Sequence, residues 1–393
     1  MRNFLERAFN ILPRLIEYRR ILHRFPELSG QEFRTTELIR KTLQEIGVEI
    51  MPWEGKTGVV GLLQGALPGP TVALRADIDA IRVQEDGNEE YRSECPGIMH
   101  ACGHDIHTAC LLGAAILLAG DRSSLAGAVK LIFEPGEEIS EGASALIAGK
   151  ALENPKVEAI FGLHTQPDLR LGTVGILEGP LMAAGDAIFI TVKGKGGHGG
   201  YPHKTRDPIV AAAAVIQAIQ NIVSRQTDPL ETIVISLGTL HAGEVRNVIP
   251  DRWEMTGNVR SFLPALREEL PDRIRIAITH AAASMGCEID FRYVHRNPPV
   301  INPIALADFA RQSLVKVFGS ESIVRPRPSM GAEDFSLFQE KIPGMFIWLG
   351  TGSGILDPDN FWHSPKFHAD EKSLAYGAAA LAQLASDYLA SNR

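Results

Sequence analysis

Short runs of apolar residues alternate with helical stretches along most of the chain. The runs are rich in Val, Ile, Leu, Phe and Ala, as expected of strands that a sheet buries on both faces. Strands that alternate with helices in this way indicate βαβ units and a mainly parallel sheet. The predicted strands are 71–76, 128–133, 159–163 and 345–349, and the predicted helices are 107–119 and 372–389.

The segment from 184 to 296 has a different pattern. Its predicted elements follow the order βαββαβ, which is typical of an antiparallel sheet with two helices on one face, the ferredoxin-like arrangement. The predicted strands are 187–192, 232–240, 253–262 and 287–294, and the predicted helices are 207–225 and 266–285.

This change of pattern predicts an insertion. We expect an α/β chain in which residues 1–183 and 297–393 form a catalytic domain with a mainly parallel sheet. Residues 184–296 form an inserted α+β domain, with hinges at Gly185 and at Asn-Pro-Pro 297–299.

Composition supports two globular domains. The chain has 393 residues, of which 45% are hydrophobic and 22% are charged, and its length exceeds what one core usually supports. The net charge of −8 and the absence of long Lys/Arg blocks argue against a nucleic-acid partner.

The predicted location is the cytoplasm. Four cysteines, at positions 95, 102, 110 and 287, are too few for a disulfide scaffold in a protein of this length and fit a reducing compartment. The N-terminal residues follow an amphipathic helical pattern without an apolar run long enough for an export signal or a membrane span, so no membrane partner is expected.

Residues 100–107 contain three imidazoles, a thiol and a carboxylate, in the order His-Ala-Cys-Gly-His-Asp-Ile-His. Imidazole and thiolate are preferred ligands of zinc and its neighbours, and carboxylates add oxygen ligands that suit a pair of ions. A helix start whose histidines only cap and pack would have the same sequence. The segment alone leaves both interpretations open.

Further residues of the ligand type follow several predicted strands. In open α/β sheets the carboxyl ends of parallel strands form the ligand site, so residues at these positions are expected to converge. This placement favours a metal site. The residues are Asp77 and Asp79, then Glu134, Glu137 and Glu138, then His164, and finally His363.

Seven ordered motifs carry a resemblance that covers nearly the whole chain. They resemble the M20 family of metallopeptidases, in the subgroup of aminoacylases, hippurate hydrolases and auxin-conjugate amidohydrolases. The resemblance implies a catalytic domain with a dinuclear metal site and a smaller dimerisation domain at the insertion. The motifs are Leu-His-Arg-Phe-Pro-Glu-Leu 22–28, Leu-Arg-Ala-Asp-Ile-Asp-Ala 74–80, residues 99–108, Glu-Pro-Gly-Glu-Glu 134–138, Gly-Gly-His-Gly-Gly-Tyr-Pro-His 196–203, Asn-Val-Ile-Pro-Asp 247–251 and Gly-Ala-Glu-Asp-Phe-Ser 331–336.

By this resemblance, Cys102 bridges two divalent ions, and His104, Glu138, His164 and His363 complete their coordination. Two cations deprotonate a bridging thiol, whose softness favours zinc, although manganese, cobalt and nickel also accept such ligands. The alternatives are a small buried cysteine and hydrogen-bonded core histidines.

The spacing of Cys102 and His104 also makes a local prediction. Two positions apart on a helix, they would point to different sides, so we expect both on the loop before the helix, with Gly103 at the bend.

Glu137 is the expected general base, because one of two adjacent carboxylates can bind metal while the other accepts a proton from water. Two surface acids are the alternative. Asp79 is expected to orient a ligand histidine. A turn or cap role for Asp79 is equally open, as it is for Asp77, Asp105 and His107.

His198 lies between glycines, in a turn that suits a packing histidine poorly. In relatives of this family the histidine of this motif comes from the partner subunit and stabilises the oxyanion of the tetrahedral intermediate. A loop histidine without a partner is the alternative. Asn247 and Arg260 are candidates for binding a substrate carboxylate or the oxyanion, or for structural ion-pair and turn roles.

The sequence departs from the family at two places. Ile81-Arg82 stands where Leu-Pro is usual, and Glu-Pro-Gly 134–136 stands where Gln-Pro-Ala is usual, which puts the substrate preference in doubt. The glycines at 350–354 lack phosphate-loop spacing and predict a mobile loop over the cleft.

The expected function is a metal-dependent amidohydrolase that cleaves N-acyl amino acids or amino-acid conjugates, as a homodimer or higher homo-oligomer. A metallo-dipeptidase or carboxypeptidase that acts on short peptides is the first alternative. A non-catalytic metal- or ligand-binding protein is the second, although it has no need for a base beside a ligand. A cytidine-type deaminase is disfavoured, because the motif His-x-Glu followed by Pro-Cys-x-x-Cys is absent.

Overall fold

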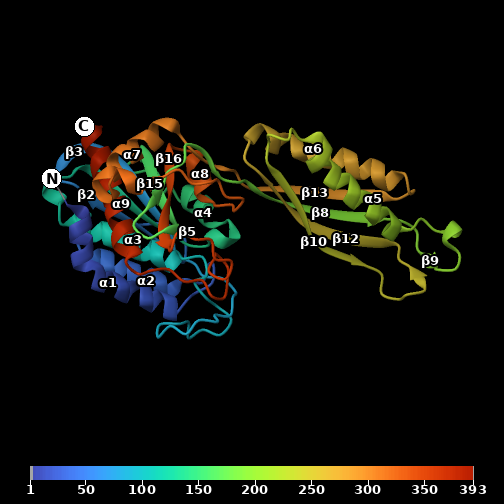
Figure 1. The fold of residues 1–393 in the computed structure, drawn as a ribbon, viewed down its shortest axis with the longest axis horizontal. Coiled ribbons are helices and arrows are strands. Elements are labelled where there is room, and N and C mark those ends of the chain that lie inside the picture. Colours follow the sequence, from blue (N-terminus) through green and yellow to red (C-terminus); the bar gives the residue numbers. More distant parts are fainter. Residues whose placement is uncertain (1–2, 393) are drawn as a thin grey trace. The chain divides into compact units, whose positions relative to one another are not determined.

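The computed structural model describes residues 3–392, which form two compact units (Figure 1). The larger unit consists of Met1–Leu181, Ile301–Arg327 and Asp334–Arg393, and the smaller unit consists of Met182–Val300 and Pro328–Glu333. Residues 328–333, which the sequence prediction left in the catalytic domain, thus group with the smaller unit.

An eight-stranded sheet forms the centre of the larger unit, in the order β1-β2-β4-β3-β5-β16-β6-β15. Strand β3 pairs in parallel with β4 and β5, and β5 pairs in parallel with β16, whereas β1, β2 and β4 pair antiparallel at one side. The predicted mainly parallel α/β class is therefore confirmed. The strands are β1 (Glu49–Met51), β2 (Val59–Gln64), β3 (Leu67–Asp77), β4 (Ala126–Glu134), β5 (Ala159–Arg170), β6 (Val174–Gly175), β15 (Ile323–Val324) and β16 (Gly344–Gly352).

Helices cover this sheet, and α3 and α9 are the most buried of them. These two helices pack against each other and against β3, and α1 packs on both, so the alanine- and leucine-rich sequences of α3 and α9 lie inside one hydrophobic core. The helices are α1 (Phe4–Arg24), α2 (Phe33–Glu45), α3 (His104–Ala119), α4 (Gly142–Ala148), α7 (Ile304–Phe318), α8 (Phe335–Gln339) and α9 (Ser373–Ser391).

The smaller unit has the predicted βαββαβ order and a four-stranded antiparallel sheet, β10-β12-β8-β13. Helices α5 and α6 pack against each other on this sheet (Figure 1) and enclose a separate core around Trp253 and Leu270. The elements are β8 (Gly185–Lys193), α5 (Pro208–Asn221), β10 (Ile233–Ala242), β12 (Arg252–Ser261), α6 (Pro264–Ala283) and β13 (Glu288–Asn297), with a short β9 (Gly197–His198) paired to β11 (Val248–Ile249).

One helical stretch, Pro208–Gln226, is long and apolar enough to cross a membrane by length and composition alone. Its residues Ala211, Val215, Ile219 and Ile222 are buried in the core of the smaller unit. The stretch therefore serves as a core helix of this unit.

Three local predictions are wrong. Strand β5 continues to Arg170, so His164 lies within the strand and not after it. Helix α3 begins at His104, so only Cys102 of the pair lies on the preceding loop. Gly350 and Gly352 belong to β16. A Cβ at either position would lie about 2 Å from a backbone carbonyl oxygen of β5, so this part of the predicted mobile loop is a packed strand end.

Candidate metal centre

The loop before α3 holds Cys102 in place through Gly103. Gly103 has φ +93°, and a Cβ at this position would lie 2.6 Å from Oγ1 of Thr165. Both the left-handed backbone and the close approach therefore require glycine. The hydroxyl of Thr165 also donates to the carbonyl of Cys102 at 3.1 Å, which ties this loop to β5.

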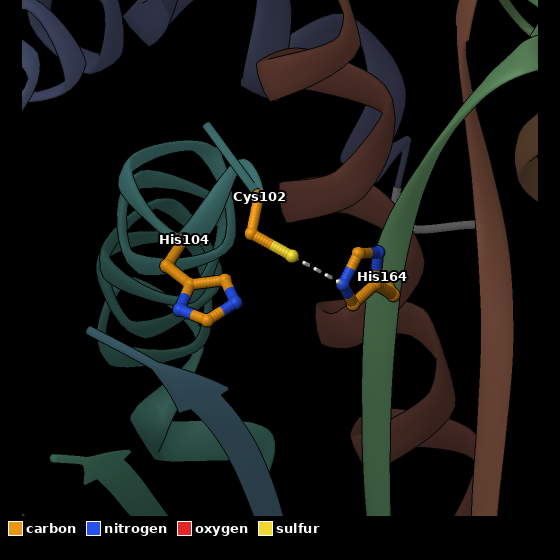
Figure 2. Close-up of side chains that lie close together, drawn as sticks. All are labelled: Cys102, His104 and His164. Carbon is orange, nitrogen blue, oxygen red and sulfur yellow. Dashed lines mark hydrogen bonds between the residues drawn. The ribbon is translucent and has the colours of Figure 1, made fainter. Parts of the chain in front are cut away.

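His164 projects from β5 toward this loop (Figure 2). Its Nδ1 lies 2.8 Å from the carbonyl oxygen of Thr165, to which it can only donate, so Nε2 carries the lone pair. Nε2 lies 3.5 Å from Sγ of Cys102. Burial, with His107 nearby, lowers the pKa of His164 well below its ordinary value, so the ring is neutral, the form that binds metal.

His104, the first residue of α3, is oriented by Asp79. Its Nδ1 lies 3.2 Å from Oδ1 of Asp79, and its Nε2 is buried without a hydrogen-bond partner among the described residues. Burial opposes protonation, but Asp77 and Asp79 outweigh it and raise the pKa of His104 to about 10. The surroundings of this ring therefore favour a positive charge, which a metal ion at Nε2 would supply.

Glu138 and His363 form the other side of the group. Nε2 of His363 lies 3.2 Å from Oε1 of Glu138. His363 has φ +63°, uncommon for a residue other than glycine, and its backbone N–H donates to the carbonyl of Ala101 at 2.8 Å. This bond holds the His363 loop next to the residue that precedes Cys102.

The five predicted ligands come together around Cys102. Candidate ligand atoms of Cys102, His104 and His164 lie within 4.8 Å of one another, and so do those of Cys102, Glu138 and His363. Burial and the carboxylates of Glu138 and Glu137 raise the pKa of the Cys102 thiol well above its usual value. A thiolate here requires positive charge beside it. A soft sulfur shared by two groups of nitrogen and oxygen donors therefore fits a pair of divalent cations.

Asp79 connects the ligands to the neighbouring glutamates. Besides His104, its carboxylate accepts the backbone N–H groups of Glu137 at 3.2 Å and Glu138 at 3.1 Å, and the hydroxyl of Ser29 at 2.6 Å. Burial raises the pKa of Asp79, but these donors outweigh it and the pKa is lowered. Asp79 is therefore ionised and holds several site residues at once.

Glu137 lies beside the candidate ligands but belongs to neither of the two groups of three that share Cys102. Its side chain is buried, and its carboxylate, with His104 and Glu138, offers atoms within 4.8 Å of one another. Oε1 of Glu137 also accepts the backbone N–H of Asp334 at 3.4 Å. This carboxylate can exchange a proton with a molecule bound next to the ligands.

His107 is not a ligand in this arrangement. Its Nδ1 lies 2.5 Å from Oδ1 of Asp77, and its Nε2 accepts the backbone N–H of Thr165 at 2.9 Å. Both ring nitrogens are therefore used: Nδ1 ties α3 to Asp77 at the end of β3, and Nε2 ties α3 to β5. Asp105 also has a structural role, because its buried carboxylate accepts Nε of Arg19 at 2.8 Å and Nδ1 of His23 at 2.9 Å.

The buried guanidinium of Arg75 binds three carboxylates next to the candidate site, and the sequence analysis did not identify this role. Arg75 donates to Glu134 at 2.5 Å, to Asp77 at 2.9 Å and to Asp334 at 3.1 Å. Its side chain is fully buried. The sequence did contain one signal, a charged residue inside the predicted apolar strand 71–76. It indicated acidic partners nearby, because a buried arginine requires them.

The remaining predicted residues lie in the smaller unit. His198 is exposed, and its Nδ1 accepts the backbone N–H of Gly200 at 3.0 Å. His198 pairs with Val248 across the β9–β11 ladder, and the backbone N–H of Gly199 donates to the carbonyl of Asn247. The structure thus brings the His198 and Asn247 loops together.

Arg260 lies on β12 of the four-stranded sheet, at the end of β8 opposite to the His198 loop. A Cβ at Gly185, the first residue of β8, would lie 2.6 Å from Nη1 of Arg260, whereas the His198 loop follows Lys193 at the end of β8. At about 3.3 Å per residue, the two ends of β8 are roughly 26 Å apart. Within one smaller unit, Arg260 therefore does not join His198 and Asn247 in a single site.

Comparisons with known proteins agree with this geometry. The model of peptidase family M20/M25/M40 matches residues 73–387. An N-acetylcysteine deacetylase of Bacillus subtilis (strain 168) is 42% identical over 381 residues, which cover 97% of each chain. Thermostable carboxypeptidase 1 of Saccharolobus solfataricus is 39% identical over 379 residues, 94% of each chain. A solved Bacillus subtilis structure, described as a dinuclear metal binding peptidase from the M20 family, has 39% identity and a TM-score of 0.85, and the match covers 97% of this chain and 99% of that one.

Proposed function

The chain belongs to the peptidase M20/M25/M40 family and is a hydrolase of amide bonds, and we propose that it releases amino acids from N-acyl amino acids. The proposal rests on the position of Cys102. Its sulfur belongs to two groups of candidate ligand atoms, and the buried carboxylate of Glu137 lies next to them. The relative named as an N-acetylcysteine deacetylase supports the acyl-amino-acid substrate class.

In this proposal Cys102, His104, Glu138, His164 and His363 hold two divalent cations, which would polarise the scissile carbonyl and make water more acidic. Glu137 accepts the proton of the attacking water at its carboxylate and returns it to the leaving nitrogen. Its backbone bond to Asp79 and its contact with Asp334 keep the carboxylate oriented for both transfers.

Zinc is the proposed metal, with manganese, cobalt and nickel as alternatives, because a thiol and three imidazoles form a soft and borderline ligand set. The proposed location is the cytoplasm. Cys95, Cys102, Cys110 and Cys287 are all free thiols, and a thiol ligand is preserved best in a reducing compartment.

A homodimer completes the proposed site through His198, which stabilises the oxyanion from the neighbouring subunit. Two observations support this part. The His198 loop lies at the end of β8 farthest from the point where the chain enters the smaller unit. Exposed apolar side chains also surround this loop, as expected of a surface that a second subunit covers: Tyr201, Ile209, Val210, Val245 and Val248.

Asn247 and Arg260 are the proposed binding residues for the amino-acid carboxylate or the oxyanion. Asn247 is exposed beside His198, so it acts together with that residue from the partner subunit. Arg260 is half-buried, and burial lowers its pKa although the nearby Asp186 acts in the opposite direction. An arginine side chain is charged in proteins and can bind a carboxylate.

The carboxypeptidase relative favours one second candidate, hydrolysis of the C-terminal bond of short peptides. The ligands and the base are the same in both cases, so the two candidates differ only in the walls of the cleft. Release of amino acid from a panel of N-acyl amino acids, compared with a panel of dipeptides, separates them.

The direct test of the proposal is Glu137→Gln. Because general base catalysis contributes about 10²–10⁴-fold, the variant should lose most of its turnover of N-acyl amino acids while it keeps the metal content of the wild type. The matched control is Glu141→Gln, which removes the exposed carboxylate of the same segment and should keep full activity. Undiminished turnover in Glu137→Gln would remove Glu137 from the mechanism.

A further inference from the structure

A pocket of about 400 Å³ opens beside two of the proposed metal ligands, Glu138 and His363. Its apolar wall consists of Leu28, Ala80, Ile81 and Ile139. This volume lies within the range of pockets that enclose small-molecule ligands and is larger than an acetyl group needs. The pocket therefore has room for an extended acyl chain next to the proposed reaction centre.

Some polar side chains of this pocket already have a hydrogen-bond partner within the protein, and others have none among the described residues. The hydroxyl of Ser29 donates to Asp79 at 2.6 Å, so it is used within the site. Arg82 and Gln31 are exposed, and within residues 3–392 neither side chain has a hydrogen-bond or ion-pair partner. The pocket thus offers one guanidinium and one amide that are free to bind a ligand.

Arg82 belongs to the Ile81-Arg82 pair at which the sequence departs from the family pattern. Proline at this position would have no charge and no donor, whereas arginine adds a guanidinium that can bind a carboxylate through two parallel hydrogen bonds. The positive charge of Arg82 has no ion-pair partner among the described residues, and four apolar side chains, Leu28, Ala80, Ile81 and Ile139, line the same pocket. An anionic group on the substrate would supply that counterion.

We infer that Arg82 selects substrates whose acyl group ends in a carboxylate, which it binds together with Gln31 while the apolar wall encloses the methylene chain. This inference rests on the proposed function. There, Asn247 and Arg260 bind the carboxylate of the amino acid, which leaves the acyl half of the substrate for the pocket beside Glu138 and His363.

The test compares two acyl derivatives of one amino acid, the N-succinyl and the N-(4-methylpentanoyl) compounds. They have nearly the same shape, because an isopropyl group replaces the carboxylate. The wild type should prefer the succinyl compound in kcat/KM, and Arg82→Gln should reduce the ratio of the two kcat/KM values by about tenfold, the effect of about 1.4 kcal/mol from a charge-assisted pair. Arg82→Lys should give an intermediate ratio, because lysine keeps the charge but loses the two parallel bonds.

Arg92→Gln is the matched control, because Arg92 is also exposed, lies ten positions away and does not line the pocket. It changes net charge equally and should leave the ratio at the wild-type value. An unchanged ratio in Arg82→Gln overturns the inference. If that unchanged ratio comes with an equal fold loss for both compounds, Arg82 is assigned to the amino-acid carboxylate instead. If the wild type hydrolyses neither these compounds nor N-acetyl amino acids, the proposed function itself fails.

Discussion

Oδ1 of Asp79 lies 3.2 Å from Nδ1 of His104, and the same carboxylate accepts the backbone N–H groups of both Glu137 and Glu138. A single buried side chain therefore fixes a proposed ligand histidine, a proposed ligand carboxylate and the proposed base. This relationship gives the site its geometry without a metal ion, because each of these bonds is made within the protein.

Replacing Asp79 should weaken metal binding more than it weakens the fold. In Asp79→Asn the amide can accept through only one oxygen, so at least one of the bonds to His104, Glu137 or Glu138 is lost. We expect metal affinity to fall about 10–100-fold, as for other partners of ligand histidines. Competition with a chelator measures the affinity. Asp290→Asn, at an exposed aspartate of the smaller unit, is the control, and equal affinities in the two variants would contradict the positioning role.

Arg75 should be essential for stability. Replacing it with methionine leaves the carboxylates of Asp77, Glu134 and Asp334 buried near one another without a cation. We expect a loss of about 3–5 kcal/mol in the free energy of unfolding of the larger unit, measured by urea denaturation. Arg252→Met, which breaks an exposed pair with Glu254, should cost less than about 1 kcal/mol. A similar small loss in both variants would show that the buried network adds nothing to stability.

Gly103 should be required for the shape of the metal site. Gly103→Ala places a Cβ 2.6 Å from Oγ1 of Thr165 at φ +93°, so the variant should lose about 1–3 kcal/mol of stability and also bind metal more weakly. Gly179→Ala isolates the backbone effect, because Gly179 has φ +79° with no atom near its Cβ position. Metal titration should distinguish the two variants, and unaltered metal affinity in Gly103→Ala would contradict the close packing between this loop and β5.

The sheet and the insertion were predictable because burial imposes a regular pattern on the sequence. Strands buried on both faces produce apolar runs, and the alternation with helices indicates their parallel arrangement. The end of β5 was not predictable in the same way. Polar residues from His164 onward suggested that the strand stops, but β5 stays paired with β16 as far as Arg170, and His164 and Thr165 find side-chain and backbone partners in the Cys102 loop and in α3.

The candidate ligands could be named from their residue types and motifs, and the structure brings all five together. The supporting residues could not be found in this way, because their roles depend on contacts between distant segments. Arg75 and Asp334 are 259 positions apart and meet only in the folded chain. The separation of Arg260 from His198 along β8 was equally hidden, because it depends on strand register and not on composition.

The proposed contribution of His198 from a partner subunit predicts complementation between two inactive variants. Glu137→Gln lacks the base but keeps His198, and His198→Ala lacks the histidine but keeps Glu137. If each site combines residues of two subunits, subunits mixed at random should recover about a quarter of the wild-type activity, because half of the dimers are mixed and each has one complete site. Unmixed samples of each variant are the controls. No recovery, with subunit exchange shown by mass spectrometry, would place both residues in one subunit. Full activity in the unmixed His198→Ala sample would place His198 outside the mechanism.

The central claim is that one sulfur joins two cations in this site, and anomalous diffraction from crystals grown with zinc tests it most directly. We predict two zinc peaks in each larger unit, both within bonding distance, about 2.3 Å, of Sγ of Cys102, and the loss of at least one of them in Cys102→Ala. A single peak that does not contact Cys102, or two peaks that remain unchanged in Cys102→Ala, would contradict the account.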